Sequence, residues 1–276
     1  MKKLIITVIM IMAVVLSGCS QDAADDSEAI TVFAAASLNG ALDELIEMYE
    51  ESHEGASLVA SYDSSGTLMA QIEEGATCDI FFSAAQKQMD ELDEKGYVAS
   101  GTRTNVVNNQ VCVVTCKGSD TKATGLGDIY KAESLALADG TVPVGKYTRQ
   151  ALVSAGMLPG SADVSLITTK EVSSALGGIE INECANVSAV ATAVAEGSNE
   201  VGTVYKSDTT GFEDKLEILE VIPYELTGNV IYPAAGIVNE DRSEEGDEIV
   251  KDFIAFLKSD EAKKVFEKYY FDTKVD

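Results

Sequence analysis

Segments typical of β-strands alternate with segments typical of helices along most of this chain, and this alternation restricts its fold more than any other feature. Residues 30–33 form a short apolar run, and residues 38–49 follow with apolar side chains on one helical face. The same pair recurs at 56–63 with 67–75, and again at 78–84 with 85–96. Strand–helix alternation predicts an α/β fold in which mostly parallel sheets are flanked by helices.

The second half of the chain continues this pattern with longer interruptions. The predicted extended segments are 106–117, 134–139, 200–205, 216–222 and 230–239, and the predicted helices are 147–157, 186–197 and 246–269. A Ser/Thr-rich stretch between the helix at 147–157 and the helix at 186–197 is less regular. No Pro/Gly-rich linker divides the chain, so a second domain has to be inserted through crossover segments.

We therefore expect two lobes, with the amino- and carboxy-terminal parts of the chain sharing one of them. The candidate crossovers are the extended run at 105–114 and the segment after Tyr205. This assigns 29–108 plus 208–276 to the first lobe and 109–207 to the second.

The amino terminus has the pattern of a secretory signal peptide. Two lysines precede an apolar run at 4–16, which is shorter than the roughly 20 residues that a membrane-spanning helix needs. The run ends in "LSGC", which resembles a bacterial lipobox, so we expect cleavage after residue 18 and a lipid on Cys19. An ordinary signal peptide with a chance cysteine is the alternative. Residues 19–28 are polar and acidic and are expected to form a tether outside the cytoplasm.

The charge balance excludes several classes of partner. The formal net charge is −26, and removal of residues 1–18 would make it two units more negative because Lys2 and Lys3 are lost. Such an acidic protein is poorly suited to nucleic acids and to anionic lipid surfaces.

The cysteines and the single histidine do not form a recognisable metal or disulfide pattern. Cys112 and Cys116 share a predicted strand, where they would be about 13 Å apart, too far for a mutual disulfide. His53 lies in a polar turn, and no second CxxC-type pair accompanies it. We expect buried free thiols at Cys78, Cys112, Cys116 and Cys184, and no zinc site.

Four loops share one arrangement, in which a strand is followed by small or hydroxyl residues and then by a helix. They are "AAAS" before Leu38, "SSG" before Thr67, "TVPVGK" before Tyr147 and "CAN" before Val187. A helix N-terminus offers unpaired N–H groups and a partial positive charge, which favour an anion. In open α/β sheets, ligands bind at the carboxyl ends of strands, where these loops lie. Each loop also has a simpler explanation, because Ser37, Ser65 and Asn186 could be N-caps and Tyr205 could be a packing residue.

Several segments together resemble the molybdate-binding proteins of ABC importers. They are "ITVFAAASL", "SYDSSGTLMAQIEEGATCDIFFSA", "VPVGKY", "NVSAVATAVAEG", "VGTVYKSD" and "YPAAGIV", and the similarity runs in order from about Ile30 to Phe271. The resemblance implies a two-lobed, type II periplasmic-binding-protein fold that holds molybdate or tungstate between its lobes. It also implies an ABC permease and its ATPase as partners, a monomeric protein, and no cofactor.

The resemblance assigns the ligand contacts residue by residue. Ser37 and Ser65 would donate through hydroxyl and backbone N–H, Val144 and Val187 through backbone N–H, and Tyr205 through its phenolic O–H, with no direct bond to the metal. The family often has a serine where this chain has Gly66. An insertion before the fourth loop leaves Val172 as an alternative to Val187, which we prefer because an uninterrupted helix, turn and strand join Val187 to Tyr205.

The chemistry of these residues suits a fully deprotonated dianion, which only accepts hydrogen bonds. None of the five is acidic, so phosphate, which keeps a proton near neutrality, should be disfavoured, whereas sulfate stays open as an alternative ligand. An enzyme is not expected. The "GTVPVGKY" stretch has Tyr147 where a phosphate-binding loop needs Ser or Thr. A serine hydrolase needs a histidine base beside its serine, whereas His53 is far along the chain from Ser37 and Ser65.

Overall fold

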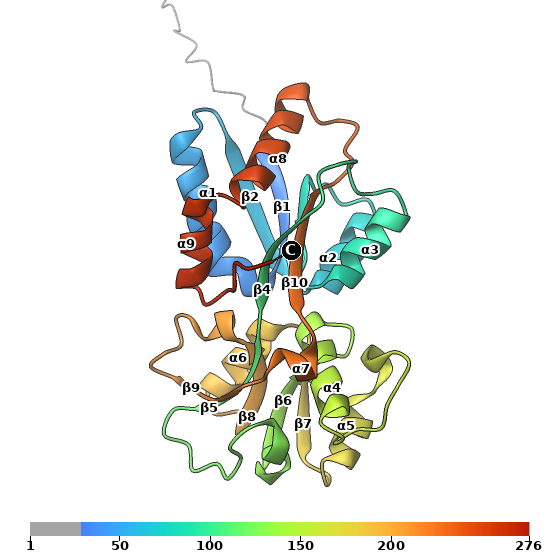
Figure 1. Cartoon of the computed structure of the whole chain (residues 1–276), viewed down its shortest axis with the longest axis vertical. Coiled ribbons are helices and arrows are strands. Elements are labelled where there is room, and N and C mark those ends of the chain that lie inside the picture. The colour runs from blue at the N-terminus through green and yellow to red at the C-terminus, as the bar shows by residue number, and fades with distance from the viewer. Residues whose placement is uncertain (1–28, 276) are drawn as a thin grey trace, which may run out of the picture.

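The computed structural model describes residues 29–275, which fold into two lobes stacked end to end (Figure 1). The predicted signal peptide at 1–18 and the whole predicted tether at 19–28, which includes Cys19, lie outside the described residues. The first lobe contains a five-stranded sheet in the order β2-β1-β3-β10-β4. Its strands are β1 (Ala29–Ala35), β2 (Ser57–Asp63), β3 (Ile80–Phe82), β4 (Thr104–Asn109) and β10 (Val230–Gly236).

The second lobe contains a five-stranded sheet in the order β7-β6-β8-β5-β9. Its strands are β5 (Val111–Cys116), β6 (Ser134–Ala138), β7 (Glu180–Cys184), β8 (Val201–Tyr205) and β9 (Leu216–Val221). In each sheet a single strand, β10 or β5, runs antiparallel to both of its neighbours, and the other strands share one direction. The predicted α/β class with mostly parallel sheets is therefore confirmed.

Helices flank both sheets, as Figure 1 shows. Those of the first lobe are α1 (Asn39–Ser52), α2 (Ser65–Glu73), α3 (Gln86–Glu94), α8 (Glu244–Phe256) and α9 (Asp260–Lys268), and those of the second are α4 (Pro143–Ser154), α5 (Thr169–Ala175), α6 (Val187–Ala195) and α7 (Tyr224–Thr227). Short 3-10 helices are η1 (Ala36–Leu38), η2 (Leu126–Lys131), η3 (Val164–Leu166) and η4 (Lys206–Thr209). The apolar stripe of α1 that includes Leu42, Leu45 and Tyr49 is buried against the first sheet, as its spacing predicts.

Two segments cross between the lobes. Gln110 alone separates β4 from β5, which agrees with the predicted crossover at 105–114. The second crossing runs from β9 through α7 to β10, later than expected after Tyr205. Because β9 pairs with β5 in the second sheet, the predicted division at 207/208 differs from the division of the sheets.

Four local predictions of secondary structure were wrong. The irregular Ser/Thr-rich stretch contains α5 and the edge strand β7, and the long helix expected at 246–269 is two helices, because the Ser259 hydroxyl caps α9 by accepting from Ala262 N–H at 3.0 Å. The "SSG" and "TVPVGK" loops end earlier than expected, since α2 begins at Ser65 and α4 at Pro143.

The four thiols of the described residues are unpaired. Cys78, Cys112 and Cys184 are buried as predicted, whereas Cys116 is only half-buried. Within residues 29–275, none of the helices combines the length and hydrophobicity that a membrane crossing needs.

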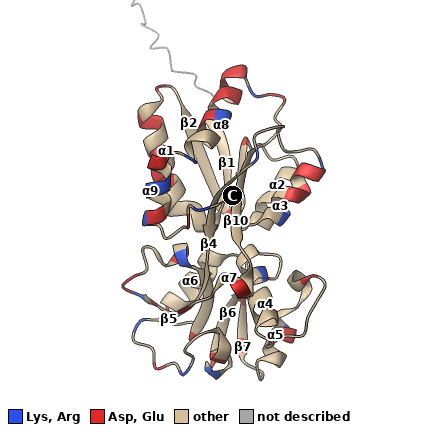
Figure 2. Cartoon of the chain, viewed as in Figure 1, with Lys and Arg blue, Asp and Glu red and all other residues tan. Residues whose placement is uncertain are grey.

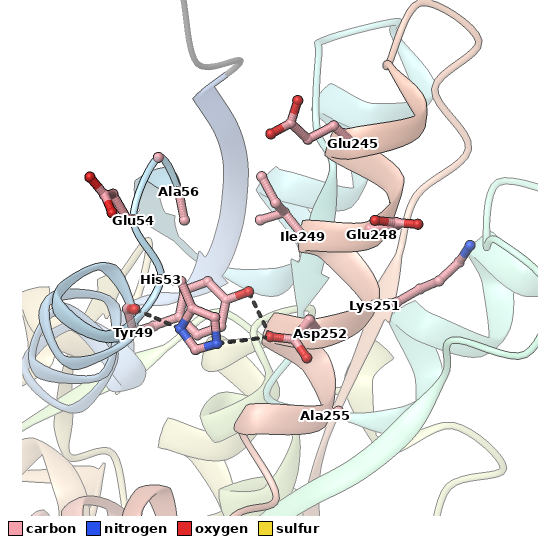
Figure 3. A pocket seen from close by; sticks show the side chains of 11 residues that line it. Tyr49, His53, Glu54, Ala56, Glu245, Glu248, Ile249, Lys251, Asp252 and Ala255 are labelled. Carbon is pink, nitrogen blue, oxygen red and sulfur yellow. Dashed lines mark hydrogen bonds and ion pairs between the residues drawn. The ribbon is translucent and has the colours of Figure 1, made fainter. Parts of the chain in front are cut away.

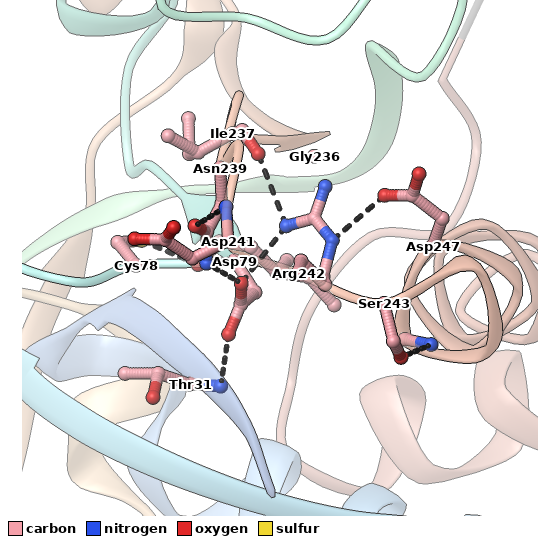
Figure 4. A network of polar contacts seen from close by, with 12 residues as sticks. Thr31, Cys78, Asp79, Gly236, Ile237, Asn239, Asp241, Arg242, Ser243 and Asp247 are labelled. Atoms are coloured by element: carbon pink, nitrogen blue, oxygen red, sulfur yellow. Dashed lines mark hydrogen bonds and ion pairs between the residues drawn. The ribbon is translucent and has the colours of Figure 1, made fainter. Parts of the chain in front are cut away.

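A buried polar network fixes the outer part of the first lobe (Figure 4). The Asp79 carboxylate accepts hydrogen bonds from Thr31 N–H at 2.8 Å, from the Asn239 amide at 2.9 Å and from Arg242 Nη1 at 2.9 Å. Arg242 also pairs with Asp247 at 2.8 Å and donates to the Ile237 carbonyl at 3.1 Å. The network therefore ties β1, the end of β10 and α8 together.

Candidate ligand-binding site

A small cavity lies between the lobes, at the carboxyl ends of β1, β2, β6 and β8. The first lobe contributes Ala35, Ala36, Ser37, Asp63, Ser64, Ser65 and Ala84, and the second contributes Val142, Pro143, Val144, Asn186, Val187 and Tyr205. All five residues predicted as ligand contacts line it. Its volume is only about 10 Å³, so the lobes have to separate before a polyatomic solute can reach it.

Among the described residues, the Tyr205 ring packs on the Tyr232 ring across the lobes with centroids 5.8 Å apart, and two polar side-chain pairs also join the lobes beside the cavity. The Asn186 amide donates to the Asp63 carboxylate at 3.4 Å, and Lys87 of α3 lies 3.6 Å from Asp163, which precedes η3. Both are weak, because the first is long and the second is solvent-exposed. This favours a hinged molecule in which a bound solute adds much of the closing free energy.

The helices that point into the cavity keep N–H groups available. The Ser64 hydroxyl caps α2 by accepting from Thr67 N–H at 3.1 Å, and the Asn186 side chain caps α6 by accepting from Ala189 N–H at 2.9 Å. Each cap satisfies the third helical N–H and leaves the first, on Ser65 or Val187, without an intrahelical partner. Helix α4 has no side-chain cap. The N–H of Val144 in its first turn has no intrahelical partner either.

The hydroxyls of Ser37 and Ser65 are not helix caps, so the structure removes the simpler explanation of both. Ser64, not Ser65, caps α2, and the residues before η1 and α1 make no side-chain cap. The Ser65 Oγ accepts from Ala84 N–H at 2.9 Å, which leaves its own proton available. The Ser37 Oγ lies 2.8 Å from the Tyr232 Oη. Asn186, in contrast, is the N-cap of α6, which was the simpler explanation of this residue.

Tyr205 ends β8 with its hydroxyl inside the protein. The residue is 1% exposed, and its Oη has no hydrogen-bond partner in the part of the chain that the structure describes. Burial raises the pKa of Tyr205, so the hydroxyl keeps its proton as a donor. A buried hydroxyl without a partner costs free energy, and this cost is removed when a ligand in the cavity accepts its proton.

The charged groups around the cavity are carboxylates and not ammonium or guanidinium groups. Among the described residues, the lining includes Asp63 and contains neither Lys nor Arg. The Asp208 carboxylate accepts from Tyr205 N–H at 2.9 Å, and burial raises the pKa of Asp208 to about 7. Asp208 also lines a neighbouring inter-lobe pocket that shares Ala36 and Ser37 with the cavity. Figure 2 shows many other acidic residues on outer helices such as α1, α3 and α8.

Arg149 supports the third loop from behind, a role that the local sequence does not predict. Its side chain is fully buried and donates to the carbonyls of Ala138 and Gly145 at 2.9 Å and of Ile167 at 2.7 Å. Gly145 is required here, because a Cβ would lie 2.1 Å from the Asp139 carbonyl oxygen. These contacts fix the start of α4, where Val144 lies. A single arginine in the sequence of an amphipathic helix does not indicate such a role.

Residues 30–272 match a family described as bacterial extracellular solute-binding protein. The chain belongs to this family. This confirms the predicted family and the prediction of a binding protein instead of an enzyme.

Individual relatives of this solute-binding protein match nearly its whole length. YvgL of Bacillus subtilis (strain 168), provisionally named as an ABC transporter substrate-binding lipoprotein, is 32% identical over 261 residues, which cover 93% of this chain and 92% of YvgL. The molybdate-binding protein ModA of Escherichia coli (strain K12) is 30% identical over 256 residues, covering 90% and 91%. The solved periplasmic molybdate-binding protein of Azotobacter vinelandii shares the fold, with a TM-score of 0.70 and 20% identity over 89% of this chain and 100% of that one.

The structure places Val172, the alternative to Val187, and Gly66, which stands where the family often has a serine. Val172 is buried inside α5 and does not line the cavity, whereas Val187 does. A Cβ at Gly66 would lie 3.7 Å from the Thr141 carbonyl oxygen of the other lobe, an ordinary contact. The position therefore has room for the first atom of a side chain.

His53 lies in a different pocket, between the end of α1 and α8 (Figure 3). Its ring stacks on Tyr49 with centroids 3.9 Å apart, and its Nε2 is 3.2 Å from Asp252. Neither Ser37 nor Ser65 lines this pocket. The histidine and the two serines are thus not assembled as a hydrolase would need.

Proposed function

We propose that this solute-binding protein captures molybdate or tungstate between its lobes outside the cytoplasm and delivers it to an ABC permease that its ATPase drives. The observation that carries the proposal is the buried Tyr205 hydroxyl, which has no hydrogen-bond partner among the described residues and belongs to a residue that lines the same cavity as Ser37 and Ser65. The molybdate-binding relatives support the choice of solute.

The proposed contacts come from both lobes. Ser37 and Ser65 donate from the first lobe, and Val144, Val187 and Tyr205 donate from the second. All are uncharged donors, and a dianion without protons accepts from each of them. A hydrogen bond to a charged acceptor is worth about 1.5–3 kcal/mol, so a set of such bonds supports micromolar to nanomolar affinity after the costs of binding.

Thermal unfolding with a panel of anions tests the proposal. Molybdate and tungstate should raise the melting temperature of the protein, because a ligand that binds only the folded state stabilises it by mass action. Phosphate should have little effect. A larger shift with sulfate than with molybdate would replace the proposed solute with sulfate, which can use the same donors.

A single substitution tests the assignment of the site. Ser37→Ala removes one donor and should weaken molybdate binding by about 1–3 kcal/mol. Ser259→Ala is the matched control, because the Ser259 hydroxyl caps α9 by accepting from Ala262 N–H at 3.0 Å and does not line the cavity. Its loss should lower stability by about 1 kcal/mol with little change in affinity. Equal affinity of Ser37→Ala and the unmodified protein would exclude Ser37.

The anchoring and oligomeric state are also proposals. Cys19, which lies outside the described residues, would carry the lipid, and Cys19→Ala should release the protein from the membrane fraction. We propose a monomer, because the two lobes of one chain already form a complete cavity. Light scattering of the lipid-free protein would detect a dimer if one forms.

A further inference from the structure

A chain of buried hydrogen bonds leads from the crossover between the lobes to Ser37. Asn109, the last residue of β4, donates through Nδ2 to the Ser207 Oγ at 2.8 Å and to the Tyr232 Oη at 3.1 Å. The Tyr232 Oη in turn lies 2.8 Å from the Ser37 Oγ. Each of these residues is at most 8% exposed, so every bond of the chain is buried.

The direction of the first bond in this chain is fixed. The Asn109 Oδ1 accepts from Gln110 N–H at 2.9 Å, which orients the amide so that its Nδ2 faces Tyr232 and Ser207. An amide nitrogen only donates. The Tyr232 Oη therefore accepts from Asn109, and the tyrosine proton has to find a different acceptor.

Within the described residues, the Ser37 Oγ is the acceptor at hydrogen-bond distance from the Tyr232 Oη, and the neighbouring Tyr205 hydroxyl makes no hydrogen bond with it. If Ser37 donated to Tyr232, the tyrosine proton would be buried without a partner, which is unfavourable. Burial also raises the pKa of Tyr232, so its proton stays in place. Tyr232 thus donates to Ser37, and the Ser37 proton is left to point into the cavity.

We propose that Tyr232, oriented by Asn109, is a positioning residue that makes Ser37 a hydrogen-bond donor and so selects fully deprotonated tetrahedral oxyanions over anions that carry a proton. This inference rests on the proposed function and adds a source of selectivity to it. An anion with a proton needs an acceptor in the site, and Ser37 provides one only at the expense of the Tyr232 bond. Polarisation along the chain also strengthens the Ser37 donor.

The test measures the affinities of the unmodified protein and of Tyr232→Phe for molybdate, sulfate and phosphate by calorimetry, with weak ligands measured by competition. Tyr232→Phe should weaken molybdate binding about five- to tenfold. Phosphate binding should weaken less or improve, so the molybdate-to-phosphate ratio should fall. Tyr49→Phe is the matched control, because it removes a hydroxyl bonded to Asp252 at 2.9 Å, away from the cavity, and it should leave the ratio unchanged.

A double-mutant cycle shows whether Tyr232 acts through Ser37. In a Ser37→Ala background, Tyr232→Phe should have no further effect on molybdate affinity. An equal loss in both backgrounds, or an unchanged anion ratio in Tyr232→Phe, would overturn the inference while leaving the proposed function intact. Failure of the unmodified protein to bind any tetrahedral oxyanion would overturn both.

Asn109→Asp provides a second route if Tyr232→Phe does not fold. An aspartate accepts where the amide donates, so Tyr232 would donate to residue 109 and Ser37 would donate to Tyr232. The reversed chain presents an acceptor to the cavity. Molybdate affinity should fall and the molybdate-to-phosphate ratio should fall with it. An unchanged ratio in this variant would contradict the inference.

Discussion

Two buried polar regions of this protein differ in how completely their hydrogen bonds are satisfied. In the Asp79–Arg242 network, carboxylate, guanidinium, amide and backbone groups satisfy one another inside a single lobe. In the inter-lobe cavity, uncharged donors remain available, and the Tyr205 hydroxyl has no partner within the described residues. The comparison indicates that the first region stabilises the fold, whereas the second keeps hydrogen-bonding capacity for a solute.

The largest expected effect is a loss of folding stability when the Asp79–Arg242 network is broken. Arg242→Ala leaves the Asp79 carboxylate buried without its cation, since both side chains are 4% exposed. It should lower the free energy of unfolding by about 3–5 kcal/mol, measured by urea denaturation. The affinity of the remaining folded protein for molybdate should stay the same. Lys268→Ala breaks an exposed pair with Glu44 and should cost less than about 1 kcal/mol; a similar loss in both variants would contradict the account.

Tyr205→Phe should give the opposite result. It removes a buried hydroxyl that has no hydrogen-bond partner within residues 29–275, so the free energy of unfolding should be unchanged or up to about 1 kcal/mol higher. Molybdate binding should weaken by about 1.5–3 kcal/mol, because a donor to a charged acceptor is lost. Denaturation and calorimetry on one preparation measure both effects. A destabilised variant with full affinity would show that the hydroxyl has a structural role only.

The pH dependence of binding sharpens the comparison, because Asp208 adjoins the cavity at Tyr205. The pKa of Asp208 is raised from 3.8 to about 7. Between these two pH values the Asp208 carboxyl is protonated in the folded protein and ionised in the unfolded chain. The contribution of Asp208 to stability therefore falls as pH rises from about 4 to about 7. A bound dianion favours the protonated carboxyl, so affinity should fall about fivefold or more between pH 6 and pH 8.

Asp208→Asn is the control for this pH effect. It should flatten the affinity profile across pH 6 to pH 8 without removing the contact to Tyr205 N–H, since an amide oxygen also accepts. A profile that keeps its full slope in this variant would assign the titration to another group.

The smallest expected effect is that of salt. A site made of short-range dipoles should change its molybdate affinity less than about threefold between about 50 mM and about 500 mM salt. Asp63→Asn removes the one carboxylate on the cavity wall and should raise affinity slightly. A steep loss of binding with salt would indicate a site made by Lys or Arg and would break the comparison between the two regions.

Much of this arrangement could be predicted from the sequence because it depends on local patterns. The strand–helix pairs follow from apolar periodicity, and all four predicted loops do reach one cavity because parallel strands end at the same edge of a sheet. Family resemblance then named five residues that line it. The contacts of these residues with a solute are still a prediction.

The parts that could not be predicted depend on contacts between distant residues. Strand β7 lies at a sheet edge with Glu180 and Glu183 exposed, so it has no apolar run. The place of β9 in the second sheet is set by pairing with β5 across about a hundred residues of chain. Neither the burial of Arg149 nor the bond between Tyr232 and Ser37 has a signal in the local sequence.

A tungstate-soaked crystal, with the metal located by anomalous scattering, tests the central claim most directly. The account predicts a single strong peak between the lobes, with oxyanion oxygens within hydrogen-bond distance of the Ser37 and Ser65 hydroxyls, the Tyr205 hydroxyl and the N–H groups of Val144 and Val187. A peak outside the inter-lobe cavity, or an oxyanion held mainly by Lys or Arg side chains, would contradict it.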